Sequence, residues 1–207
     1  MRIVRLLLCL FLLAITLSVE GCGLSPTSQN DGRTASSKLD AVVPEKQTVK
    51  PVGTASLVVN PSRLIIPTIG INALVEPLGI LPNGDLATPV RNPWEDVGWY
   101  NGGPHPGEHG SAVIDGHLDR PRGYPAVFWR LRNLQVGSQV LVVNSDGKTL
   151  HFQVTSIAYY TPQSAPIQDI FGNSGGTYLN LITCAGDWIP TQHQTALRLV
   201  VYTSLQK

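Results

Sequence analysis

Short apolar segments, many of them β-branched, follow one another from about residue 60 to residue 207. Segments of this length that are rich in Val, Ile, Thr and aromatic residues predict β-strands. Strands are expected at 63–66, 111–114, 139–143, 150–155, 178–183 and 196–202. Asp146-Gly147 lies between two alternating runs and predicts a tight hairpin turn. Long helical periodicity is absent, and short helices are expected only around 93–97 and 126–131. The pattern therefore predicts a mainly β domain, either a sandwich or a closed barrel.

The pattern at the N-terminus is different. Arg2 and Arg5 precede an apolar run from Leu6 to Leu17, which is the layout of a secretory signal. The run is shorter than the roughly 20 apolar residues of a transmembrane helix. It is followed by Val19-Glu20-Gly21-Cys22, and a small residue before a cysteine is typical of the lipobox at which bacterial lipoproteins are processed. We therefore predict a signal peptide over 1–22 with possible lipidation at Cys22. The alternative is a signal that is cut elsewhere or retained, with Cys22 incidental.

The composition changes twice after the signal. Residues 23–57 are rich in Ser, Thr, Pro, Gln, Asp and Lys without an apolar period, which predicts a flexible polar tether. Residues 58–207 are long enough for one domain with its own core. The net charge of +1 and the lack of a basic block argue against a nucleic-acid partner. No acidic cluster suits calcium, so we expect neither a metal nor a cofactor.

Cys184 ends the apolar run 178–184 and is the only cysteine after Cys22. It has no partner for a disulfide within the domain, so it is either a small buried hydrophobe or a nucleophile. The expected export exposes a thiol to oxidation, which favours a functional cysteine. His117 follows the apolar run 111–116, and Arg198 lies inside the run 196–202. A thiol, an acid/base and a fixed cation are the parts of a cysteine acyltransferase.

Taken singly, the two companions of Cys184 are weak signals. Arg198 could be a surface residue of an alternating strand, and His117 is one of five histidines. The others are His105, His109, His151 and His193. The first two lie in a Gly/Pro loop and are expected to be solvated, while the third is expected to face outward from a strand. The fourth lies in a polar loop between Cys184 and Arg198 and is a rival base.

Three phrases, taken together, resemble the sortase family. They are Gly116-His117-Leu118-Asp119, Leu181-Ile182-Thr183-Cys184 and Arg198-Leu199-Val200-Val201. Sortases carry a histidine in a Gly-His-x-Asp-like turn, a Thr-Leu-x-Thr-Cys strand end and an arginine on the following strand. The resemblance covers most of residues 60–207. The phrases at 106–119, 127–131 and 136–140 are most similar to the class F branch.

The resemblance implies a closed β-barrel of about eight strands with a few short helices. It also implies a cysteine transpeptidase, which cleaves a Leu-Pro-x-Thr-Gly-like (LPXTG-like) C-terminal sorting signal between Thr and Gly through a thioacyl enzyme. The product passes to an amine acceptor, either a cell-wall peptide or a protein lysine. Cys184 would be the nucleophile, His117 the general acid/base and Arg198 the group that stabilises the oxyanion and orients substrate. Asp119 would support the turn of His117, and Trp188 would be a groove wall or a packed loop aromatic.

Other functions remain open at this point. With water in place of an amine, the same residues would make a cysteine protease that hydrolyses the same bond. A peptidoglycan cross-linking cysteine transpeptidase fits less well, because its cysteine usually follows a glycine near a serine and directly precedes an Arg-like residue, whereas Ala185-Gly186 follows Cys184 here. A non-enzymatic alternative is an exported β-barrel lipoprotein that binds peptides or cell-wall polymer. Every one of these predicts a protein on the extracytoplasmic face, anchored to the membrane through its N-terminal segment or a lipid.

Overall fold

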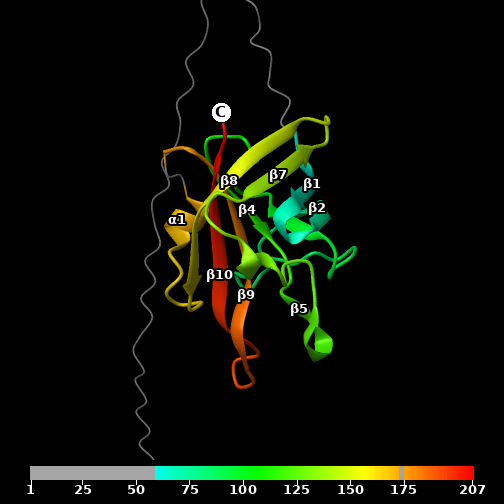
Figure 1. Ribbon diagram of the computed structural model, residues 1–207. Helices are drawn as coiled ribbons and strands as arrows, with labels where there is room; N and C mark the ends of the chain where they lie inside the picture. Colours follow the sequence, from blue (N-terminus) through cyan, green and yellow to red (C-terminus); the bar gives the residue numbers. More distant parts are fainter. Residues whose placement is uncertain (1–58, 173–174) are drawn as a thin grey trace, which may run out of the picture. The chain divides into compact units, whose positions relative to one another are not determined.

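The computed structural model describes residues 59–172 and 175–207, and these belong to one compact unit (Figure 1). The expected signal, Cys22 and the expected tether lie outside the described residues. Within the described ranges, no helix has both the length and the apolar character needed to cross a membrane.

Eight strands of the described residues close into a barrel. They are β1 (Pro61–Ile66), β2 (Ile71–Leu78), β3 (Val97–Tyr100), β4 (Gly110–Asp115), β7 (Gln139–Asn144), β8 (Thr149–Tyr160), β9 (Thr177–Ile189) and β10 (Gln194–Leu205). Their order is β1-β2-β3-β4-β9-β10-β8-β7, and β7 pairs back onto β1. The β2–β3 and β4–β9 pairs are parallel, whereas the remaining pairs are antiparallel. The expected mainly β closed barrel is confirmed.

Short elements fill the connections between the strands. They are a hairpin of β5 (Asp119–Arg120) and β6 (Tyr124–Pro125), the 3-10 turns η1 (Pro67–Ile69), η2 (Pro121–Gly123) and η3 (Leu131–Asn133), and the helix α1 (Ile167–Phe171). The helices expected around 93–97 and 126–131 are absent from these two described segments. Residues 92–96 form turns, and Val97 already begins β3. In the second segment, the bonds from Trp129 N to Ala126 O and from Leu131 N to Phe128 O each span three residues, so the chain forms successive turns that lead into η3.

Every strand expected from the sequence lies within an observed one, and the hairpin turn at Asp146-Gly147 is confirmed by a bond from Gly147 N to Asn144 O. Strands β2 and β3 were not expected. Pro77 interrupts the apolar pattern of β2, and Gly98 lies in the middle of β3. The glycine is required by packing, since a Cβ atom at position 98 would overlap the side chain of Leu78.

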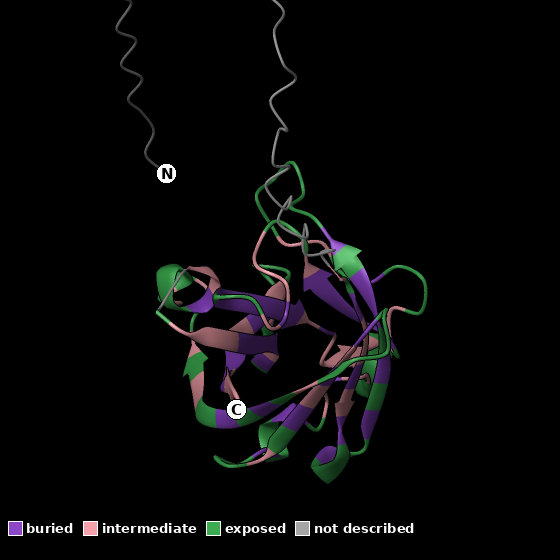
Figure 2. Ribbon diagram, turned by 90° about the horizontal axis from the view of Figure 1, so that it is seen from above, coloured by how far each residue is buried: buried purple, intermediate pink, exposed green. Residues whose placement is uncertain are grey.

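The barrel interior holds the main apolar core, whose buried strand segments are purple in Figure 2. A smaller cluster lies on the outer face of β4, β9 and β10, where Val113, Ile182 and Val200 pack against Ile170 of α1. Successive side chains of a strand point to opposite faces. The residues two positions away from this cluster, namely Asp115, Cys184 and Arg198, therefore share its outer face. This face carries the candidate site.

Candidate active site

Cys184 and Arg198 are Cα partners in the antiparallel ladder of β9 and β10, the long hairpin drawn in orange and red in Figure 1. Directly opposed residues of such a ladder share a face, with Cα atoms about 5 Å apart. The thiol of Cys184 is free and partly buried. The register therefore places the thiol and the guanidinium side by side.

Cys184 does not lie at the end of a strand, contrary to the sequence prediction. Strand β9 continues to Ile189, but its register with β10 shifts just after the cysteine, between the Ala185–Leu197 pair and the next one. Gly186 at φ +72° allows this irregularity, because the left-handed region is unfavourable for other residues. A bulge bends a strand locally and often re-aims a side chain beside an active site. The sequence analysis expected a strand end to present the thiol, and the bulge after Cys184 provides this break in the regular strand.

The guanidinium of Arg198 is held by the hairpin itself. Its Nη1 donates to Thr195 Oγ1 at 3.1 Å, to Leu197 O at 3.1 Å and to Thr195 O at 3.3 Å. Its Nη2 donates to Gln194 Oε1 at 3.0 Å. A cation fixed in this way can meet a developing negative charge without reorganising.

His117 follows β4, which runs parallel to β9. The last β4–β9 pair joins Asp115 to Ile182, and His117 and Cys184 each lie two residues further along their chains. Beyond that pair, Gly116 N donates to Ile182 O at 3.3 Å, and the buried Thr183 Oγ1 donates to Gly116 O at 2.7 Å. Thr183, which precedes Cys184, is therefore hydrogen-bonded to Gly116, which precedes His117.

An aromatic contact holds His117 from the other side. Its ring lies 5.0 Å from that of Trp94, centroid to centroid, at an interplanar angle of 47°. The turn that carries Trp94 is tied to the segment after His117 by an ion pair of 2.8 Å between Glu95 and Arg120. Burial lowers the pKa of His117, and the nearby charge of Asp119 opposes that effect. Near neutral pH this favours the neutral imidazole, the form that accepts a proton.

Cys184 and Arg198 line one groove, but the ring of His117 lies against Trp94 outside the groove lining. Among the described residues, no hydrogen bond joins the cysteine to the histidine. Catalytic hydrogen bonds are often long in unliganded enzymes and tighten when substrate binds. The expected triad is thus brought to neighbouring strand positions without being locked together.

The groove has a volume of about 700 Å³. Its floor is the outer face of the sheet, where Ile182 and Val200 surround the polar groups, and α1 forms one wall. Trp188, which is 58% exposed, and Ile167, which is also 58% exposed, both line the groove. Of the two sequence interpretations of Trp188, the groove wall is therefore correct. An extended peptide can lie along this apolar channel and pass the thiol.

Asp115 is a groove residue that the sequence analysis missed. It is the last residue of β4 and lines the groove together with Cys184 and Arg198. Loss of hydration raises the pKa of its carboxyl to about 7, and the positive charge of Arg198 and a hydrogen bond to the Gly116 backbone offset only part of this rise. The available signal was an acidic residue at the end of an otherwise apolar strand, two positions before the candidate histidine.

The remaining histidines lie in different places. His193, at φ +52° in the β9–β10 hairpin, lines the groove and remains a candidate base. His109 is exposed, as expected. His105 is not a solvated loop residue, because its ring packs 4.4 Å from that of Trp99 and bonds to Asn60 Oδ1 at 3.1 Å.

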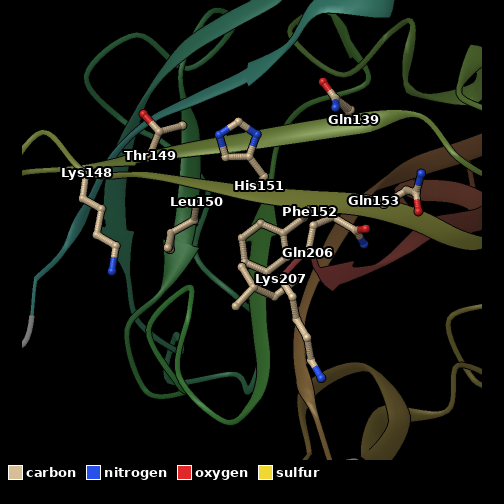
Figure 3. Close-up of a pocket in the computed structure, with 10 residues that line it drawn as sticks. Gln139, Lys148, Thr149, Leu150, His151, Phe152, Gln153, Gln206 and Lys207 are labelled. Carbon is tan, nitrogen blue, oxygen red and sulfur yellow. The ribbon is translucent and has the colours of Figure 1, made fainter.

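A second groove, of about 550 Å³, lies over β7, β8 and the C-terminal residues (Figure 3). It is lined by the exposed His151 together with Lys148 and Lys207, and Cys184 is not part of it. In residues 59–172 and 175–207, no group of three or more His, Cys, Asp or Glu side chains is placed to hold a metal ion.

Comparison with known proteins gives a family and a fold. A family model described as "Sortase domain" matches residues 64–206. Similar solved structures include sortase C-1 from Actinomyces oris (formerly Actinomyces naeslundii), which is 23% identical over 70% of this chain and 73% of that chain, with a TM-score of 0.55. Sortase A from Corynebacterium diphtheriae, in a lid mutant, is 19% identical over 70% of this chain and 69% of that chain, with a TM-score of 0.55. Sortase C from Clostridium perfringens SM101 is 21% identical over 70% of this chain and 68% of that chain, with a TM-score of 0.53. None of the curated proteins matched the chain.

Proposed function

Because the chain belongs to the sortase family of cysteine transpeptidases, we propose that Cys184, His117 and Arg198 perform its acyl transfer on an LPXTG-like sorting signal. One observation carries the assignment of these residues. Cys184 and Arg198 are direct partners on the floor of a peptide-sized groove, and His117 occupies the neighbouring position beside the cysteine.

The first half of the reaction forms a thioester. The Cys184 sulfur gives its proton to neutral His117 and attacks the carbonyl carbon of the substrate threonine. The carbonyl electron pair moves onto oxygen, and the guanidinium of Arg198 stabilises the resulting oxyanion. As the oxyanion collapses, the Thr–Gly C–N bond breaks, and protonated His117 gives its proton to the leaving glycine amine.

The second half transfers the acyl group. An incoming amine loses a proton to His117 and attacks the thioester carbonyl, the C–S bond breaks, and the released Cys184 thiolate recovers its proton. The acceptor is a cell-wall peptide or a protein lysine. The charge of Asp119 favours the protonated imidazole of His117, which is the role in which this residue supports the reaction.

The substrate and the attachment of the enzyme complete the proposal. The leucine and proline of the signal suit the apolar part of the groove around Ile182 and Val200. Residues 58–207 are the catalytic domain, 23–57 the tether and 1–22 the signal, with lipid on Cys22 holding the enzyme on the extracytoplasmic face. The phrases at 106–119, 127–131 and 136–140 support a class F sortase.

The test uses the purified full chain and a fluorogenic Leu-Pro-x-Thr-Gly peptide, with and without an amine. We expect a covalent acyl mass on Cys184 and product whose formation depends on the amine. Replacing Cys184 by alanine should abolish the adduct, and His117→Ala or Arg198→Ala should reduce turnover by orders of magnitude. An adduct that only hydrolyses would favour the protease alternative.

His193 is the matched control for the base, since it lines the groove itself, whereas the ring of His117 lies outside the groove lining. The variant His193→Ala should retain far more activity than His117→Ala. If the two losses were equal, the base assignment would fall, and a nearly fully active Arg198→Ala enzyme would remove the oxyanion role from the arginine.

A further inference from the structure

Asp115 places a carboxyl on the floor of the substrate groove beside the nucleophile. Its Cα partner on β9 is Ile182, two residues before Cys184. Two residues of a strand span about 7 Å, whereas the residue before a threonine whose carbonyl reaches Cys184 lies only about 3.5 Å back along an extended peptide. In a substrate that runs from Cys184 towards Ile182, a long side chain at that position, such as lysine or arginine, can cover the remaining distance to Asp115.

The carboxyl of Asp115 has no ion-pair partner in the described part of the chain, although it is partly buried. The positive charge of Arg198 and a hydrogen bond to the Gly116 backbone favour its ionised form without offsetting the loss of hydration. The guanidinium of Arg198 donates to Gln194, Thr195 and Leu197 of the hairpin and forms no ion pair with Asp115. Around Asp115 the floor consists of Ile182 and Val200. A partly desolvated acid without a bonded cation gains most from a donor that the substrate brings.

Among the charged groups of the groove, Asp115 is the one placed to accept a hydrogen bond from a donor of the substrate. Arg198 and Cys184 come from the sheet, His193 from the hairpin and Asp85 from the loop before β3, while α1 contributes only the apolar residues Ile167, Ile170 and Phe171. Asp85 is already bonded to Asn83 Nδ2 at 2.7 Å. The strand beside Asp115, β3, places Gly98 opposite it, without a side chain.

We infer that Asp115 is a specificity-determining residue, which selects sorting signals with a hydrogen-bond donor, best a lysine or arginine, at the variable position before the threonine. The inference rests on the proposed sortase function and narrows its substrate class. The variable position is the one concerned, because the flanking leucine, proline and threonine of such a signal carry no charge. A basic side chain there meets Asp115, whereas an acidic one is repelled and loses hydration.

The experiment measures acylation of Cys184 by three peptides, Leu-Pro-Lys-Thr-Gly, Leu-Pro-Gln-Thr-Gly and Leu-Pro-Glu-Thr-Gly, on the full chain. The readout is the ratio of kcat/KM within each enzyme, which does not require the variants to be equally active. We expect the lysine peptide to exceed the glutamate peptide by about tenfold or more, the size of one charge-assisted contact. Asp115→Asn should bring this ratio close to one. Asp146→Asn removes the same charge from the distant β7–β8 turn and should leave the ratio intact.

A pH series adds an independent readout. Since the pKa of Asp115 is raised to about 7, the lysine-to-glutamate ratio should grow as the pH rises through that value. Effects of pH on the reactivity of the enzyme that are common to both peptides cancel in the ratio. Charges of other groove residues act on the two peptides with opposite sign, and the Asp115→Asn variant retains all of them. In the Asp115→Asn variant this growth should disappear.

The outcomes separate the inference from its premise. If wild type acylates with all three peptides at similar rates, or if the preference for lysine survives in Asp115→Asn, the inference is wrong while the sortase function stands. If no peptide forms an adduct on Cys184, the proposed function fails and the inference falls with it.

Discussion

Replacing Thr183 by valine removes the hydroxyl that joins the cysteine strand to the histidine loop and keeps the branched shape of the side chain. The lost bond is the one from Thr183 Oγ1 to Gly116 O, at 2.7 Å, and the residue is 1% exposed. A buried carbonyl that loses its donor costs about 1–3 kcal/mol. In a domain of this size each kcal/mol lowers Tm by about 2–4 °C, so Tm should fall by about 2–12 °C.

The chain offers a matched control for this change. Thr203 Oγ1 donates to Leu179 O, also at 2.7 Å, and Thr203 is 0% exposed. Thr203→Val should therefore lower Tm by a similar amount, but its bond lies near the start of β9, away from Cys184. Only Thr183→Val loosens the position of His117 relative to the thiol. A misplacement of about 1 Å can cost on the order of 100-fold in rate, so we expect kcat for acylation to fall by about tenfold or more, with little change in KM.

Thermal unfolding and single-turnover acylation, followed by intact mass, measure the two effects separately. Rates are compared well below the Tm of each variant, so that unfolding does not contribute. The reasoning would be refuted if both variants lost the same stability and Thr183→Val still acylated at the wild-type rate. The bond would then stabilise the barrel without positioning the histidine.

Three further changes test other contacts of the site. Trp94→Ala should admit water to His117, raise the pKa of its imidazole towards 6.5 and move the pH profile of kcat/KM to higher pH. If NMR showed the same imidazole titration in the variant and the wild type, burial against Trp94 would not be the cause of the lowered pKa. Asp115→Asn should raise Tm relative to wild type by an amount that grows from about pH 4 to about pH 7. The pKa of Asp115 is raised from 3.8 to about 7 in the folded state, so ionisation of this carboxyl favours the unfolded state across that window. A gain in Tm that is equal at all pH values would show that the effect does not come from this ionisation. Gln194→Ala removes the acceptor of Arg198 Nη2 and should lower kcat several-fold with little effect on Tm, because the bond is partly solvated. The rate of acylation is measured by rapid mixing, and an unchanged kcat would show that the guanidinium does not need this hydrogen bond.

The strands at the centre of the site were predictable from the sequence because their apolar residues are β-branched and their breaks are Gly, Asp and Asn. The same signal failed for β2 and β3. Pro77 and Gly98 weaken the strand pattern locally, and these two strands form because they pair with each other and close the barrel. The strand preference of single residues carries no information about this long-range pairing.

The catalytic candidates were found by residue type and by resemblance, whereas their arrangement required the structure. Cys184 and Arg198 belong to one hairpin, so their proximity follows from the antiparallel register. The position of His117 depends on the parallel pairing of β4 with β9, between segments far apart in the chain. Asp115 was overlooked for the same reason, since its importance depends on which face of β4 becomes the groove floor.

The parallel β4–β9 pairing has a consequence for the order in which the enzyme becomes competent. A hairpin such as β9–β10 closes a short loop, whereas joining β4 to β9 closes a much longer one and brings together contacts of large sequence separation, which form slowly. The thiol and its cation can therefore meet early in folding, while the imidazole arrives only when the distant strands have docked. A chain that is still folding would thus hold its proposed nucleophile without the proposed proton carrier until the barrel is complete, so that topology alone suppresses premature acylation.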